Sequence, residues 1–281
     1  MSTRTDETTG RAGVRLAAVL AAGAVGVQMA FPFTDGGTLA LTAASVVLLS
    51  AAAVVHALAT RGARTAAVLV VVAGGGGLLA EAVGVRTGFP FGEYAYSGTL
   101  GWEVLGVPAL VPMAWTMMAW PALLVARWLV SRTVPAISAA GSRLAVALLG
   151  AWTLTAWDVF LDPQMVDLGH WTWADPTPGL PGVEGIPLTN FAGWLLVSFL
   201  MVGVLDRLVD PGDGPDGVRD AVPFAVYLWT YFSSVLAHAV FFGRPPVALV
   251  GAVVMGAVAV PLALTWLRAR PVPTPAPEHV G

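Results

Sequence analysis

Residues 247–267 read VALVGAVVMGAVAVPLALTWL, an apolar stretch without a single charged side chain. As a helix it is long enough to cross the hydrocarbon core of a bilayer, which takes about 20 residues. A helix also satisfies its backbone there, because lipid offers no hydrogen bonds to exposed N–H and C=O groups. The stretch therefore predicts a transmembrane helix.

Seven further stretches have the same character, so we expect an all-α, polytopic integral membrane bundle of about eight transmembrane helices. The eight predicted spans are residues 14–31, 39–58, 65–85, 107–130, 144–160, 188–204, 222–242 and 247–267. The composition agrees, since 57% of the 281 residues are hydrophobic and only 11% are charged, too few charges for a water-exposed surface. We expect one helical domain over residues 1–270 and a disordered, proline-rich tail over residues 271–281.

The arginines are distributed unevenly between the two sides of this predicted bundle. With the N-terminus inside the cell, the outer side carries only Arg86 and Arg244. The cytoplasmic segments carry Arg4, Arg11, Arg15, Arg61, Arg64, Arg127, Arg132, Arg143, Arg207, Arg219, Arg268 and Arg270. Because basic loops stay in the cytoplasm, we expect both termini there and a multi-pass protein of the plasma membrane.

The composition also excludes several classes of chemistry. The chain has no cysteine, which removes thiolate nucleophiles and cysteine metal sites, and no lysine, which removes a Schiff base to retinal or pyridoxal phosphate. The four histidines stand singly and not at metal-ligand spacing. We therefore expect no metal, no cofactor and, with a net charge of only -3, no nucleic-acid partner.

The first candidate site residue is Glu81, near the outer end of the third predicted span. An ionisable group inside a span is energetically costly, so it is usually functional or paired. The alternative is that Glu81 pairs with Arg86 or anchors the helix at the interface. The segment that follows, TGFPFGEYAY at residues 87–96, is expected to form a reentrant turn or an interfacial loop.

The second candidate is a pair of carboxyl groups, Asp158 and Asp162, at the outer end of the fifth span. Residues four apart share one helix face and stand about 6 Å from each other. Two carboxyl groups that close in an apolar setting do not both ionise easily, so one is available as a general acid near neutral pH. The alternative is that Asp162 ends the helix in water before Pro163 and leaves only Asp158 buried.

The third candidate group leads into the sixth span, where Asn190 and Trp194 share a helix face. Asn190, like His238 in the seventh span, is either part of a site or a partner in an interhelical hydrogen bond. Trp171 and Trp173 are interpreted as an aromatic belt at the membrane interface.

Taken in order, these segments resemble the CruF-type family of membrane carotenoid biosynthesis proteins. The resemblance is carried by Glu81, TGFPFG (87–92), YAY (94–96), GVP (106–108), PMAW (112–115), WD (157–158), DP (162–163), WTW (171–173), GIP (185–187) and NF (190–191). It implies a carotenoid hydratase, which adds water across the terminal C=C bond of an acyclic carotenoid end and gives a tertiary alcohol. Substrates of this family are of the lycopene or γ-carotene type, or C50 precursors of the bisanhydrobacterioruberin type.

Hydration of such an alkene needs an acid, a site that tolerates a tertiary carbocation, and a positioned water, but no metal or redox cofactor. From burial and spacing we expect Asp158 to be the acid, Glu81 or Asp162 to hold the water, and Asn190 to support it. Aromatic faces stabilise a cation by about 0.5–2 kcal/mol each. The residues expected to bind the substrate through such faces are Trp157, Trp194, Tyr94, Tyr96 and Trp115.

Two other functions stay open. A non-catalytic scaffold that binds carotenoids or lipids would use the same aromatic loops, but two or three carboxylates at matching depth would be unexplained. A proton-coupled transporter would also contain intramembrane acids, although here they cluster at one leaflet. The expected partners are a carotenoid from the bilayer, membrane lipids and, as a further option, other enzymes of the carotenoid pathway.

Overall fold

The computed structural model describes residues 3–34, 37–134, 138–211 and 216–269. The tail over residues 271–281, which the sequence predicts to be disordered, lies outside the described residues. The long helices are α1 (Thr3–Gln28), α2 (Leu39–Leu69), α3 (Gly76–Thr87), α4 (Leu110–Thr133), α5 (Ala139–Asp167), α6 (Leu188–Leu208), α7 (Ala221–Leu236) and α8 (Pro245–Arg268). Three short elements adjoin them: the 3-10 turn η1 (Phe31–Phe33) and the π-helical turns η2 (Val70–Gly75) and η3 (Ala237–Phe241).

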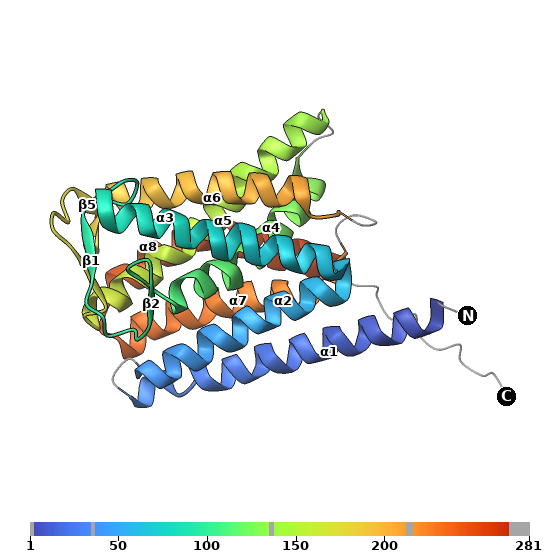
Figure 1. Ribbon diagram of the computed structural model, residues 1–281, viewed down its shortest axis with the longest axis horizontal. Coiled ribbons are helices and arrows are strands. Elements are labelled where there is room, and N and C mark those ends of the chain that lie inside the picture. Colours follow the sequence, from blue (N-terminus) through green and yellow to red (C-terminus); the bar gives the residue numbers. More distant parts are fainter. Residues whose placement is uncertain (1–2, 35–36, 135–137, 212–215, 270–281) are drawn as a thin grey trace.

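Seven helical stretches in the described part of the chain are long and apolar enough to cross a membrane. One of them, Leu39–Thr87, has 49 residues and runs through α2, η2 and α3. The helix is broken inside it at Gly62, where φ is 82° and ψ is 172°, a backbone conformation that glycine adopts without a steric penalty. Figure 1 shows that the chain reverses direction there, so this stretch makes two crossings. The described residues therefore make eight crossings, and the all-α polytopic fold is confirmed.

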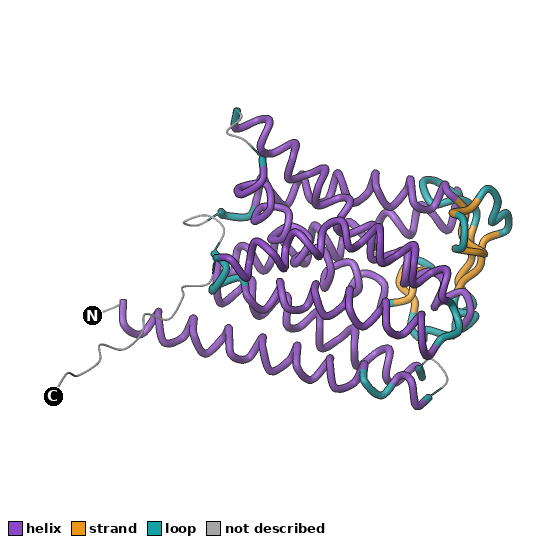
Figure 2. The backbone as a smooth tube through the Cα atoms, turned by 180° about the vertical axis from the view of Figure 1, so that it is seen from behind, coloured by secondary structure: helices purple, strands orange, loops and turns teal. Residues whose placement is uncertain are grey.

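Six short strands lie together at one end of the bundle, as Figure 2 shows. They are β1 (Tyr94–Tyr96), β2 (Glu103–Val104), β3 (Val107–Pro108), β4 (Trp171–Trp173), β5 (Gly179–Leu180) and β6 (Val183–Pro187). The pairs β1–β4, β2–β3 and β5–β6 form antiparallel two-stranded sheets. The start of α1 and the end of α8 lie at the opposite end of the bundle (Figure 1). Which end faces the cytoplasm stays a prediction from the arginines.

The helices differ in how much of their surface is covered by protein. α4 is buried along most of its length, as expected of a helix that is apolar on all sides, whereas α1 lies on the outside of the bundle (Figure 1). α4 packs against α2, α5 and α7, and α5 packs against α6 and α8. The interior of the bundle is therefore organised around α4 and α5.

Two glycines on α5 and α8 allow these helices to approach their neighbours closely. A Cβ atom added to Gly251 of α8 would lie 2.2 Å from the ring of Phe160 on α5. A Cβ atom added to Gly150 of α5 would lie 2.5 Å from Val202 on α6. Without a side chain at these positions the backbones come close enough to gain van der Waals contact, which drives helix association in lipid.

Gly251→Ala is expected to destabilise the protein by about 1–3 kcal/mol, because its methyl group has no room beside the rigid ring of Phe160. The matched control is Gly26→Ala on α1, where an added Cβ meets nothing within 4 Å and alanine is the better helix former. The stability of both variants is measured by heating them in detergent and recording the temperature at which the monodisperse peak on size exclusion is lost. Equal midpoints for the two variants would contradict the proposed α5–α8 contact.

Candidate active site

Glu81 lies inside the protein in the middle of α3, and its side chain is 5% exposed. Its carboxylate accepts three hydrogen bonds from two other elements. Tyr94 Oη and Tyr96 Oη on β1 donate to Oε2 at 2.5 and 2.9 Å, and Trp115 Nε1 on α4 donates to Oε1 at 3.1 Å. Three donors on one carboxylate stabilise its ionised form.

The alternative partner for Glu81, Arg86, is engaged elsewhere. Its guanidinium donates to the backbone carbonyl of Ala82 at 2.6 Å. The alternative interpretation, in which Glu81 pairs with Arg86 or anchors the helix at the interface, is therefore wrong. Glu81 is a buried carboxylate held by neutral donors.

The pairing of β1 with β4 builds an aromatic wall beside Glu81. Tyr94 is opposite Trp173 and Tyr96 is opposite Trp171, and the two tyrosine rings meet edge to face with centroids 5.6 Å apart. Burial, and then the negative charge of Glu81, raise the pKa of both tyrosines above the ordinary phenol value. Both hydroxyl groups therefore stay protonated and remain donors.

Trp171 and Trp173 are part of this wall and not of a lipid-facing belt. They are 9% and 8% exposed, and the indole N–H of Trp173 donates to the backbone carbonyl of Phe91 at 3.0 Å. Belt residues face the headgroups, so the interpretation of these tryptophans as a belt is wrong. The missed signal was the shared alternation of YAY and WTW, since alternate residues of two paired strands line one face.

Asp158 and Asp162 lie on the same face of α5, as their spacing predicts. The helix continues through Pro163 to Asp167, and Asp158 and Asp162 are 0% and 2% exposed. The alternative in which Asp162 ends the helix in water is therefore wrong. The fifth helix, whose span the sequence predicts to end at residue 160, continues to Asp167.

Asn190, at the start of α6, bridges the two carboxyl groups. Its Nδ2 atom donates to Asp158 Oδ2 at 2.9 Å and to Asp162 Oδ2 at 2.5 Å. An amide nitrogen carries two hydrogens, so both bonds form at once. The interhelical hydrogen bond and the site role, which the sequence left as alternatives for Asn190, are combined in one residue.

Three tryptophans from three helices pack beside these acids. The rings of Trp115 and Trp194 are stacked, with centroids 4.1 Å apart and an interplanar angle of 14°. Trp157 meets Trp194 edge to face at 6.2 Å and 83°. The three residues bring α4, α5 and α6 together around one aromatic surface.

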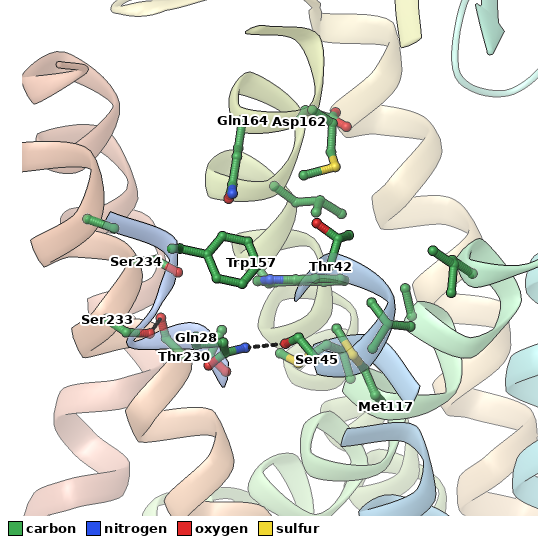
Figure 3. A pocket seen from close by; sticks show the side chains of 18 of the residues that line it. Gln28, Thr42, Ser45, Met117, Trp157, Asp162, Gln164, Thr230, Ser233 and Ser234 are labelled. Carbon is green, nitrogen blue, oxygen red and sulfur yellow. Dashed lines mark hydrogen bonds between the residues drawn. The ribbon is translucent and has the colours of Figure 1, made fainter. Parts of the chain in front are cut away.

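These groups share one cavity of about 600 Å³. Glu81, Asp162, Asn190, the tyrosines of β1 and the tryptophans described above line it, whereas Asp158 does not. Figure 3 shows Trp157 in the middle of this cavity, with Asp162 and Gln164 on one side and Gln28, hydrogen-bonded to Ser45 at 2.9 Å, on the other. The structure thus brings the predicted site residues together around one cavity. Asp158 does not line this cavity and lies behind Asn190, to which it is hydrogen-bonded.

The cavity also reaches the outside of the bundle. Phe33, after α1, and Phe232, on α7, both line it and are 88% and 57% exposed. These exposed apolar side chains border the cavity where it opens at the surface of the bundle. The walls are apolar and aromatic apart from a few polar groups, which is typical of a binding site for an apolar molecule.

His238 is a residue of this cavity for which the sequence left two uses open. It lies in η3, is 1% exposed and packs on the ring of Phe160 with centroids 5.5 Å apart. Its Nδ1 atom has no hydrogen-bond partner among the described residues. Within the same part of the chain, no group of three or more His, Asp or Glu side chains is arranged to hold a metal ion.

Comparison with known proteins gives the chain a family. A family model described as carotenoid biosynthesis protein matches residues 41–261, which contain all the site residues described above. The chain is 33% identical over 179 residues to bisanhydrobacterioruberin hydratase of Haloarcula japonica; the match covers 61% of this chain and spans 57% of that relative's length. No solved structure matches the chain.

Asn190→Leu is expected to lower the free energy of unfolding by about 1–3 kcal/mol, because two buried carboxyl groups lose their shared donor. The control on the same helix is Ser198→Ala, at a buried hydroxyl without a partner in the described part of the chain, which is expected to be neutral. The fraction of protein that survives heating in detergent distinguishes them. If Asn190→Leu is as stable as Ser198→Ala, the bridge does not stabilise the site.

Proposed function

The chain belongs to the carotenoid biosynthesis protein family, and on this premise we propose that it is a hydratase acting on an acyclic carotenoid end. It adds water across the terminal C=C bond and gives a tertiary alcohol. The observation that carries the proposal is that Asp162 and Glu81, two buried carboxyl groups with different hydrogen-bond partners, line one apolar cavity. The name of the haloarchaeal relative supports hydration and, among carotenoid types, a C50 substrate.

Asp162 is the acid in this mechanism. It faces the cavity, whereas Asp158 lies behind it, so a proton reaches the substrate from Asp162. Two buried carboxyl groups this close share one proton more easily than they carry two charges. Asp158 then acts as a positioning residue, which shares this proton with Asp162 and is held beside it by Asn190. This differs from the assignment of the acid role to Asp158 that the sequence favours.

The proton adds to the less substituted alkene carbon, and the electron pair of the double bond forms the new C–H bond. Positive charge is left on the tertiary carbon. The aromatic rings of Trp115, Trp157 and Trp194, which pack on one another and line the cavity, stabilise this cation. Such contacts contribute about 0.5–2 kcal/mol each, with the larger values in dry sites.

Glu81 positions the water that captures the cation. Its carboxylate is held by Tyr94, Tyr96 and Trp115, which fix it at the cavity wall, where it can orient a water molecule. Water adds its oxygen to the tertiary carbon, and the proton it loses passes to Glu81. The cycle is complete when this proton returns to the aspartate pair, so the net change is the addition of one water.

Two rival functions predict no new product. A carotenoid-binding scaffold uses the same aromatic cavity but has no use for the aspartate pair, and a proton-coupled transporter uses the acids without modifying a pigment. The test is expression in a host that accumulates lycopene or C50 precursors, followed by mass spectrometry of the extracted pigments. Hydration gives a gain of about 18 mass units, with oxygen from labelled water and not from labelled dioxygen.

Asp162→Asn is expected to reduce product formation at least about 100-fold, because an amide cannot protonate the alkene. Asp158→Asn is expected to reduce it less and without changing the KM. The control is Glu103→Gln, an exposed carboxylate of the strand-bearing end, which is expected to leave turnover unchanged. Unaltered product from Asp162→Asn in membranes that contain the folded protein would refute the acid role, and unaltered pigments with the wild-type chain would favour the scaffold.

A further inference from the structure

A second cavity, of about 680 Å³, lies between the bend of α2 at Gly62, the end of α4, the start of α5 and the end of α6. These parts lie at the end of the bundle away from the strands (Figure 1), so this cavity is separate from the one that holds the acids. Five arginines and three aspartates line it: Arg61, Arg64, Arg127, Arg143, Arg207, Asp206, Asp210 and Asp220. The lining therefore has two positive charges in excess.

Part of this charge is paired inside the protein and forms the floor of the cavity. Arg61 Nη2 donates to both carboxylate oxygens of Asp220 at 2.9 and 3.0 Å. Arg127 Nε donates to Asp206 Oδ1 at 2.7 Å. These pairs are almost fully buried, with side chains 1–10% exposed. The cationic excess is therefore carried by the rim, where Arg64, Arg143 and Arg207 are exposed.

The buried arginines of the floor still have unused donors. Arg61 Nε and Arg127 Nη1 are buried and have no acceptor among the described residues. A buried N–H of a charged group without an acceptor is costly. Because Arg61 and Arg127 line the cavity, their unused donors and the excess charge together indicate that an anion from outside the chain completes this site.

We propose that this cavity binds the phosphate group of an anionic membrane lipid. Guanidinium groups match phosphate oxygens in charge and geometry, and basic pockets between the ends of transmembrane helices are suited to lipid headgroups. The remaining walls include Leu124, Val130 and Val146, which can contact the glycerol and the first carbons of the acyl chains. The site does not depend on the proposed hydratase activity, and it works in either orientation of the bundle.

Arg64→Gln combined with Arg143→Gln tests the proposal without touching the buried ion pairs. The control combines Arg15→Gln with Arg268→Gln, which removes two exposed arginines from the same end of the bundle but outside the cavity. Binding to each purified chain in detergent is measured by native mass spectrometry with phosphatidylglycerol, with phosphatidylcholine, and with inorganic phosphate alone. Monodispersity on size exclusion confirms that each variant is folded.

The wild-type chain and the control are expected to bind one phosphatidylglycerol in preference to phosphatidylcholine. At about fivefold per arginine, the cavity variant is expected to bind phosphatidylglycerol about 25-fold more weakly. Equal weakening in the control, or an unchanged preference in the cavity variant, would overturn the site. Tight binding of inorganic phosphate with no preference between the two lipids would overturn the proposal of a lipid ligand. It would instead assign the cavity to a soluble phosphate.

Discussion

A carboxyl group inside a lipid-embedded bundle is stable only when the protein itself supplies hydrogen-bond donors, and this requirement organises the strand-bearing end of the molecule. Glu81 obtains its donors from β1 and α4, and the aspartate pair obtains its donor from α6. Each acid thus connects the helix that carries it to elements distant in sequence. The hydrogen bonds that hold the acids of the site are consequently the same contacts that hold this end of the bundle together.

The connecting segments hold these donors in place because glycines let them lie directly against the helices. A Cβ atom on Gly193 of α6 would lie 2.6 Å from the carbonyl oxygen of Pro90, and one on Gly77 of α3 would lie 2.5 Å from the Trp115 ring. The backbone at Pro90 therefore lies directly against α6 at Gly193. The Trp115 ring lies against α3 at Gly77, where its indole N–H can donate to Glu81. Replacing either glycine moves a donor or the wall of the cavity, although neither residue touches the acids.

The sequence predicts the spans and most of the site because both depend on local signals. Apolar stretches of sufficient length identify the helices, the cost of an acid in such a stretch identifies Glu81 and Asp158, and a spacing of four pairs Asp158 with Asp162. The rest depends on contacts between distant segments. The alternation of WTW indicates a strand but not that this strand pairs with the one of Tyr96, and no local pattern reveals that Asp162 and not Asp158 faces the cavity.

The site is built from packed helices and from connecting strands, and these two kinds of element differ in how readily they change during evolution. The acids and the bridging amide stand on helices inside the bundle, whereas four aromatic side chains of the cavity wall come from β1 and β4, which belong to the connections. Connections accept substitution and changes of length more readily than packed helices. Substitution in β4 can therefore reshape the cavity while the donors of Glu81 stay in place, whereas a change in β1 also removes the tyrosines that hold this carboxylate.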